Sequence, residues 1–246
     1  MKGMTMKMKS SDELADHSAA YEELSQALFK EWEQRIKREI SFGADGAVDP
    51  VLYFASRPRV LYILKEIHGS PWTTDDLRLF LRNKANRGFT WNNVVRWKRL
   101  MDSAFLAPGA ALPDYDEQPP IGTRERKREL ASIAAINLKK VPGTSDAHDN
   151  TIQLFAKQHG DLLARQVALI DPDIIIAGGV LLKHIHGFEG LDEKKEPFWC
   201  VEDLLGRKRL VVWSYHPQAY GKDRVSYNFM RKVADEASQR HGQFWQ

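Results

Sequence analysis

The chain of 246 residues is 43% hydrophobic and 28% charged, and its formal net charge is +3 at pH 7. This composition excludes a disordered protein, and the length suits one α/β domain or two small ones. The single cysteine, Cys200, excludes an internal disulfide and a cysteine-based metal or iron–sulfur site, which favours a reducing, cytoplasmic location. The slight excess of positive charge permits a nucleic-acid partner without requiring one. No apolar run approaches the ~18 residues of a membrane span, so we expect no membrane association.

The first part of the chain predicts a tail and a helix. Residues 1–10 carry lysines without the apolar stretch of a signal peptide, and we expect them to form a disordered tail. A long helix is predicted within residues 11–40, because apolar side chains recur there at helical spacing. Two glycines and a proline then interrupt the pattern. We therefore expect an N-terminal helical extension over residues 11–50, followed by one α/β domain over residues 51–246.

Four short apolar runs follow, and each is typical of a strand buried on both faces of a parallel sheet. They are Val60–Leu64, Ile133–Ile136, Ile174–Ala177 and Leu210–Trp213. Helical patterns lie between and after them, at residues 91–105, 150–170, 180–186 and 224–240. This alternation predicts an α/β fold, a three-layer α/β/α sandwich around a central four-stranded parallel sheet. Residues 107–123 contain four prolines and are expected to form a long loop.

The carboxyl ends of the strands are where a doubly wound sheet binds ligands, so the residues just beyond each strand are the candidates for chemistry. Glu66 follows the first run, Asn137 the second and His216 the last. A carboxylate, an amide and an imidazole at one edge have the composition of an active site. Each residue also has a plain alternative. Glu66 could pair with a lysine such as Lys65, Asn137 could cap a turn, and His216 could be structural.

The segments that hold these residues resemble the motifs of one enzyme family. They read KEIHG at 65–69, INLKKVPG at 136–143, DPDIIIAGG at 171–179 and YHPQA at 215–219. In this order and spacing they are similar to the GEAPG, NVVK-type, NPKVIVALG and His-Pro-Ser motifs of the uracil-DNA glycosylase superfamily, especially its bacterial and archaeal branches. Residues 88–92, GFTWN, resemble the family's PFVG stretch. The resemblance covers residues 58–235.

The motifs depart from the family pattern at several positions. Lys65 stands in place of the first glycine of GEAPG, His68 in place of its proline, and Gln218 in place of the serine of the closing motif. GEAPG-type enzymes usually hold an iron–sulfur cluster with four cysteines, whereas this chain has one cysteine. The resemblance therefore implies a glycosylase that uses no metal and no other cofactor.

The resemblance assigns catalytic roles to three residues. Base excision passes through a cationic sugar and an anionic leaving base, and the nucleotide must first be flipped out of the duplex. Glu66 is expected to position water and to stabilise the positive charge on the sugar. Asn137 is expected to read the edge of the base, since an amide both donates and accepts hydrogen bonds. His216 is expected to donate a hydrogen bond to the departing base.

Four further residues are expected to bind the substrate. Phe89 would stack on the extruded base, and His68 and Lys139 would line its pocket. Gly69 stands where uracil-specific members carry a tyrosine that excludes substituents at C5, so the resemblance implies a site open to 5-modified pyrimidines. The alternatives are core packing for Phe89, a solvated loop position for His68, and a turn that needs a positive φ for Gly69.

Contacts to DNA are expected from residues that follow the second and last motifs, with Lys140 at the phosphates and Tyr220 and Lys222 in a loop that enters the minor groove. The residues expected to make these contacts are Lys140, Gln218, Tyr220 and Lys222. Basic clusters at residues 96–99, 124–128 and 207–209 are weaker candidates, because a run of charges is usually a solvated face.

Together these features predict a monomeric, monofunctional DNA glycosylase that leaves an abasic site. The favoured substrate is a 5-modified cytosine, such as glucosylated hydroxymethylcytosine, in phage DNA, with antiviral defence as the biological use. Three alternatives stay open: a uracil-DNA glycosylase of base excision repair, a non-catalytic nucleic-acid-binding protein with the same fold, and an N-glycosidase of free nucleosides.

Overall fold

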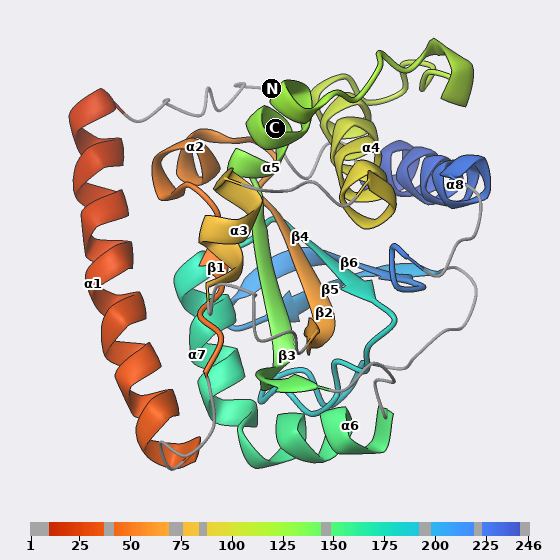
Figure 1. Cartoon of the computed structure of the whole chain (residues 1–246). Helices are drawn as coiled ribbons and strands as arrows, with labels where there is room; N and C mark the ends of the chain where they lie inside the picture. Colours follow the sequence, from red (N-terminus) through yellow and green to blue (C-terminus); the bar gives the residue numbers. More distant parts are fainter. Residues whose placement is uncertain are drawn as a thin grey trace.

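A mixed sheet of six strands, in the order β1-β3-β2-β4-β6-β5, runs through the part of the chain that the structure describes (Figure 1). The structure is a computed structural model, and it describes residues 10–36, 42–68, 76–83, 88–143, 149–191, 198–218 and 223–241. The strands are β1 (Gly46–Ala47), β2 (Val60–His68), β3 (Ala134–Gly143), β4 (Ile174–Gly178), β5 (Trp199–Leu204) and β6 (Arg207–Ser214). The helices are α1 (Ser11–Ile36), α2 (Pro50–Ala55), α3 (Leu77–Asn83), α4 (Gly88–Leu106), α5 (Thr123–Ala131), α6 (Asp149–Gln158), α7 (Gly160–Ile170) and α8 (Asp223–His241).

The four apolar runs expected as strands form the parallel centre of the sheet, β3-β2-β4-β6. The expectation of a four-stranded parallel sheet was wrong at both edges, because β1 pairs antiparallel with β3 and β5 antiparallel with β6. A tight turn joins β5 to β6, and its residues Leu205 and Gly206 have φ angles of 54° and 75°. Positive φ at both positions matches the twist of a two-residue hairpin. The middle residues of β5 are partly or fully exposed, so this edge strand lacks the continuous apolar pattern of a buried one.

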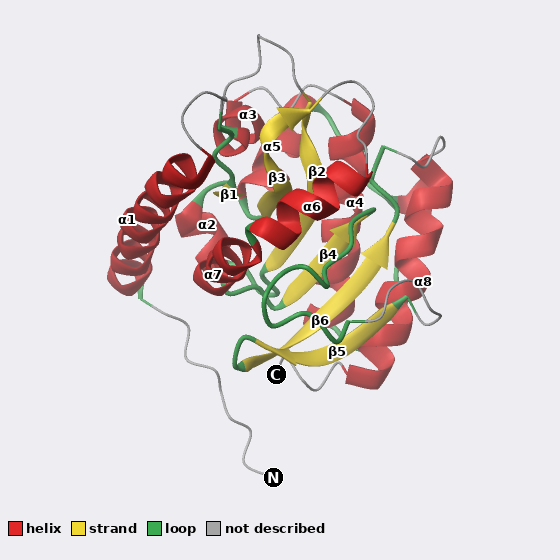
Figure 2. Ribbon diagram, turned by 90° about the horizontal axis from the view of Figure 1, so that it is seen from below, coloured by secondary structure: helices red, strands yellow, loops and turns green. Residues whose placement is uncertain are grey.

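Helices cover both faces of the sheet (Figures 1 and 2). α1, α2 and α7 lie on one face, and α4 and α8 lie on the other. Strand side chains alternate between the faces, so each face has a core of its own. Leu61 and Ile63 of β2 pack with side chains of α1 and α7, whereas Val60, Tyr62 and Leu64 pack with α4 and α8.

α1 belongs to the same core as the sheet. The helix begins at a reciprocal cap, in which the Ser10 N–H donates to Glu13 Oε2 at 2.7 Å and the Glu13 N–H donates to Ser10 Oγ at 3.2 Å. Its inner face buries Trp32 completely. Tyr21 on the same face accepts the Ala47 N–H through its hydroxyl oxygen at 2.9 Å, which fixes β1 against the helix.

Two helical expectations were wrong. The pattern over residues 150–170 forms two helices, α6 and α7, rather than one. At the break, Gly160 packs so closely on the His184 carbonyl that a Cβ there would overlap it. Residues 180–186 are irregular, with turns from residue 183, instead of the expected helix. The expected loop before α5 is confirmed, with one 3-10 turn at Tyr115–Glu117.

Candidate active site at the carboxyl edge of the sheet

The carboxyl ends of the four parallel strands meet at one edge of the sheet, which faces the viewer in Figure 2. Glu66 lies near the end of β2, Asn137 lies within β3, and His216 follows β6 by two residues. Adjacent strands are ~4.8 Å apart, so about 10 Å separates β2 from β6 and about 14 Å separates β3 from β6. The structure thus places all three expected catalytic residues at the same edge, at separations that long side chains and one nucleotide can span.

Glu66 is held between two features of β3. It lies directly opposite Lys139 in the parallel register, and the two side chains form an ion pair in which Glu66 is 7% and Lys139 11% exposed. On its other side the backbone of Gly143 packs so closely that a Cβ there would overlap the carboxylate. The structural alternative for Glu66, an ion pair with a lysine, is therefore present in the structure, and the lysine is Lys139. Lys65 has a different partner, because its ammonium lies 2.7 Å from a carboxylate oxygen of Asp149 on α6.

A bulge in β3 brings Gly143 against Glu66. Glu66 pairs with Lys139 but His68 pairs with Gly143, so one residue of β2 is opposite three residues of β3. Lys140, the first of these three, turns to the opposite face and is completely buried. Because side chains alternate along a strand, the two neighbouring lysines lie on opposite faces of the sheet, one beside Glu66 and one in the core.

The buried position of Lys140 corrects the expectation that this residue binds the DNA backbone. Its ammonium lies 2.6 and 2.9 Å from the two carboxylate oxygens of Asp45 and 5.7 Å from the centre of the Trp32 ring. Gln166 donates to the same carboxylate at 2.8 Å. Burial lowers the pKa of Lys140, and the Asp45 carboxylate opposes this effect. A lysine with no exposed surface cannot reach a phosphate.

Asn137 is 3% exposed and points to the same face of the sheet as Glu66, since it is two residues from Lys139. Its backbone N–H donates to Asp45 Oδ2 at 2.7 Å, so the buried aspartate fixes the backbone at this point. Asn137 pairs with Leu64 within a strand that continues to Gly143, and the alternative of a turn cap was therefore wrong.

His216 is a neutral hydrogen-bond donor at neutral pH. Burial lowers its pKa to about 4, and the nearby Lys65 ammonium contributes to the lowering. Its Nδ1 accepts the Gln218 backbone N–H at 3.2 Å. That bond leaves the proton of the neutral ring on Nε2, so the imidazole can donate a hydrogen bond to a ligand. Gln218, expected to touch DNA, is exposed and orients the histidine through its backbone.

The end of β4 and the helix α4 position the histidine. Gly179 has a φ of 71°, and a Cβ on it would lie 3.0 Å from the His216 nitrogen and 3.5 Å from Lys65 Cε. The glycine therefore allows the two side chains to approach each other. Asn93 of α4, which is 2% exposed, donates from its side-chain amide to the Pro217 carbonyl at 2.9 Å. We name residues 215–218 the histidine loop. Sequence reasoning missed Asn93, although a polar residue between the apolar positions of a helix was a usable signal.

The other expected substrate contacts are placed only in part. Phe89, at the start of α4, is 68% exposed, so the alternative that it packs in the core was wrong. Its exposed ring is available to stack on a ligand. Gly69, Tyr220 and Lys222 lie outside the described residues, and so does the side chain of His68.

Each basic cluster named from the sequence contains a buried residue that bonds another residue of the protein. Lys98 is 5% exposed and bonds Asp102, and Arg126 is 7% exposed and donates to Asn92 at 2.7 Å. Arg209 is 2% exposed and lies 3.0 Å from Asp171 at the amino edge of the sheet, away from the candidate site. These three residues are buried in contacts within the protein. The expectation that they contact phosphates was therefore wrong.

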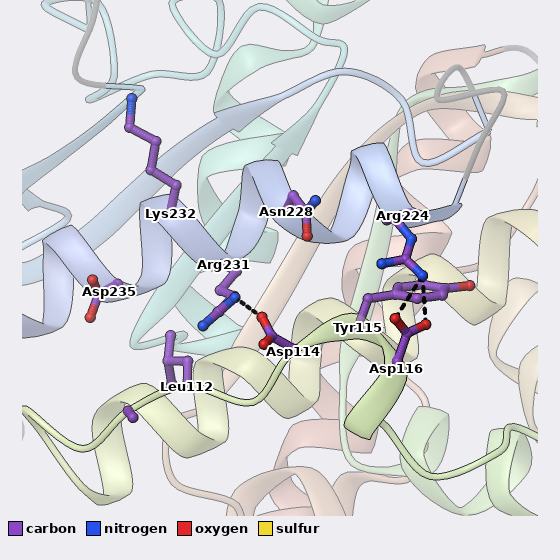
Figure 3. A pocket seen from close by; sticks show the side chains of 10 residues that line it. Leu112, Asp114, Tyr115, Asp116, Arg224, Asn228, Arg231, Lys232 and Asp235 are labelled. Atoms are coloured by element: carbon purple, nitrogen blue, oxygen red, sulfur yellow. Dashed lines mark hydrogen bonds and ion pairs between the residues drawn. The ribbon is translucent and has the colours of Figure 1, made fainter.

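A pocket of about 710 Å³ lies elsewhere, between α8 and the proline-rich loop that precedes α5 (Figure 3). None of the three expected catalytic residues lines it. Within the described ranges, no group of three or more His, Cys, Asp or Glu side chains is arranged to hold a metal ion. The helices of those ranges include none that is both long and apolar enough to cross a membrane.

The candidate site thus combines a carboxylate that is covered by its neighbours, a buried amide and a neutral imidazole donor on one side of a parallel sheet edge. No protein-family model matches the chain, and no curated protein matches its sequence.

Proposed function

We propose that the protein is a DNA glycosylase that hydrolyses the bond between a flipped-out base and its deoxyribose. The observation that carries the proposal is His216, whose Nε2–H is oriented as a donor by the Gln218 backbone at the edge that also holds Glu66 and Asn137. A neutral donor suits an anionic leaving base, because it can stabilise the developing charge without transferring a proton.

The proposed reaction assigns one task to each residue. The bond from C1′ to the base nitrogen breaks, and its electron pair leaves with the base. Glu66 orients a water molecule toward C1′ and accepts its proton as the new C1′–O bond forms. Asn137 hydrogen-bonds the edge of the base, and His216 donates to a base oxygen that becomes negative. Phe89 supplies a stacking surface for the extruded ring.

The proposed substrate is a 5-modified pyrimidine, and this part of the proposal rests on the sequence. By the sequence resemblance, glycine stands at position 69 where uracil-specific members of the superfamily carry a tyrosine, and a glycine has no side chain to exclude a substituent at C5. The test is to incubate the protein with oligonucleotides that contain uracil, a thymine mismatch, hydroxymethylcytosine or its glucosylated form. Alkali then cleaves the strand wherever a base has been released, and the cleaved oligonucleotide identifies the substrate.

The catalytic assignment is tested with Glu66→Gln. This variant should lose base release by about 10²- to 10⁴-fold, the usual contribution of a positioned acid–base group. Glu33→Gln, the same change on the exposed surface of α1, is the matched control and should keep full activity. Base release by Glu66→Gln at the wild-type rate would place the catalytic site elsewhere.

The ion pair between Glu66 and Lys139 favours the second candidate, a nucleic-acid-binding protein without catalysis. In that case the glutamate serves the strand end alone. The wild-type protein would then bind DNA but release no base from any of the oligonucleotides, and Glu66→Gln would change only the free energy of unfolding.

A further inference from the structure

Cationic and polar side chains of α8 line the pocket, and those of Arg224 and Arg231 point toward the proline-rich loop in Figure 3. The row of these side chains consists of Arg224, Asn228, Arg231 and Lys232, and one acidic residue of α8, Asp235, lines the pocket beyond them. Residues spaced by three, four and seven positions share one helical face, and the nine residues from Arg224 to Lys232 span about 12 Å along the helix axis. One strand of a duplex carries a phosphate every ~3.4 Å, so this length matches several phosphates.

A segment of the same protein occupies this row. We name residues 107–122 the acidic loop, because Asp114, Asp116 and Glu117 lie in it. Nη2 of Arg224 lies 2.6 and 2.8 Å from the two carboxylate oxygens of Asp116. Arg231 forms an ion pair with Asp114. Each carboxylate therefore binds a guanidinium in the way that a phosphate group would.

An aromatic side chain of the acidic loop completes the contact with α8. The guanidinium groups of Arg96 and Arg224 each lie 5.0 Å from the centre of the Tyr115 ring. The Tyr227 hydroxyl on α8 donates to the Pro113 carbonyl at 2.7 Å. The loop thus meets α8 through ion pairs and through groups that a nucleic acid also offers, anionic oxygens and flat rings, and its Leu112, 6% exposed, packs in the core on this side.

The two ion pairs are exposed to solvent. The side chains of Arg224 and Asp116 are 57% and 69% exposed, and those of Arg231 and Asp114 are 36% and 66% exposed. Exposed ion pairs contribute little to stability, so another anion can replace the carboxylates at small cost. α8 also begins close in sequence to the histidine loop, since Arg224 follows His216 by eight residues.

We propose that the row on α8 binds the phosphodiester backbone of the strand beside the excised nucleotide, and that the acidic loop occupies the row in the absence of DNA. The inference rests on the proposed function, because it assigns the flanking strand of the same substrate to this face. The acidic loop competes with DNA and thereby weakens the binding of unmodified DNA.

The test measures DNA binding and not catalysis. The probe is a fluorescein-labelled single-stranded oligonucleotide of ordinary bases, and its anisotropy is followed at low salt. Asp114→Asn/Asp116→Asn removes the competing charges and should tighten binding by about 2- to 30-fold, the range that two exposed ion pairs permit. Arg224→Gln/Arg231→Gln should weaken binding and reduce the slope of log K against log salt by about 1.4, for two lost phosphate contacts.

A matched control separates this local effect from net charge. Asp12→Asn/Asp16→Asn changes the charge by the same amount on the exposed surface of α1, which covers the other face of the sheet. This control should bind as the wild type does. Tightening that is equal in both double variants, or absent in Asp114→Asn/Asp116→Asn, would overturn the proposal.

A second measurement uses the wild-type protein alone. DNA binding should accelerate hydrogen exchange at the amides of the 3-10 turn in the acidic loop, because DNA displaces the loop from α8. Slower exchange there would contradict the displacement. Because the oligonucleotide contains no modified base, the anisotropy and hydrogen-exchange measurements do not depend on base excision. They can be interpreted even if the protein excises no base. If the protein excises a base but the two double variants bind DNA as the wild type does, this inference is refuted and the proposed function stands.

Discussion

Acid should destabilise the protein through His216, whose partly buried imidazole has a pKa lowered to about 4 from an ordinary value of 6.5. In the unfolded chain this group takes up a proton as the pH falls below about 6.5, whereas in the folded protein it stays neutral until about pH 4. The unfolded state therefore binds more protons in this range. The stabilising contribution is complete above pH 6.5 and is lost progressively as the pH falls towards 4.

The magnitude follows from the two pKa values. Between about pH 7 and about pH 4.5 the linkage relation gives a loss of about 2.4 kcal/mol in the free energy of unfolding. The imidazole is only partly buried, and solvent screening reduces this to about 1 kcal/mol.

The assay compares urea unfolding of the wild type and of His216→Gln at both pH values. The glutamine keeps a donor of similar size but does not titrate. The difference in unfolding free energy between the two proteins should shift by about 1 kcal/mol in favour of His216→Gln at the lower pH. Proton NMR of the imidazole should show that it titrates well below pH 6.5 in the folded protein. An equal pH dependence of both proteins, or a titration near 6.5, would refute the argument that burial keeps this histidine neutral.

Three further substitutions test the surroundings of the site. Lys140→Met should cost about 3–5 kcal/mol in urea unfolding, because it leaves a buried carboxylate unpaired; a loss below about 1 kcal/mol would show that the core tolerates that charge. Gly143→Ala should cost about 1–3 kcal/mol, since its Cβ would overlap the carboxylate of Glu66. Gly190→Ala, which has no neighbour within 4 Å of the new Cβ, is its control, and equal effects would contradict the close contact. Asn93→Ala should cost about 1–3 kcal/mol and raise the pKa of the imidazole in the histidine loop as water enters. An unchanged imidazole titration would show that the loop is held by other contacts.

Local patterns in the sequence were sufficient to predict the parallel centre of the sheet and to place the candidate site at one edge of it. Each of the four apolar runs is long enough to bury a strand, and the side chains that follow such strands must lie at one edge of a parallel sheet. Glu66, Asn137 and His216 could be placed there for that reason. The edge strands β1 and β5 could not be found in this way, because one has two residues and the other is half exposed.

Only the tertiary structure decided which partners these side chains meet. Lys139 and Lys140 are adjacent and chemically identical, yet the register of β3 pairs one with Glu66, and the other points to the opposite face, where it is buried against Asp45, 95 residues away. Asn93 reaches the histidine loop across 124 residues of sequence. The sequence determined the strands because their apolar pattern is local. Ion pairs, the register shift and the neutral state of His216 depend on contacts between distant segments, which exist only after the chain has packed.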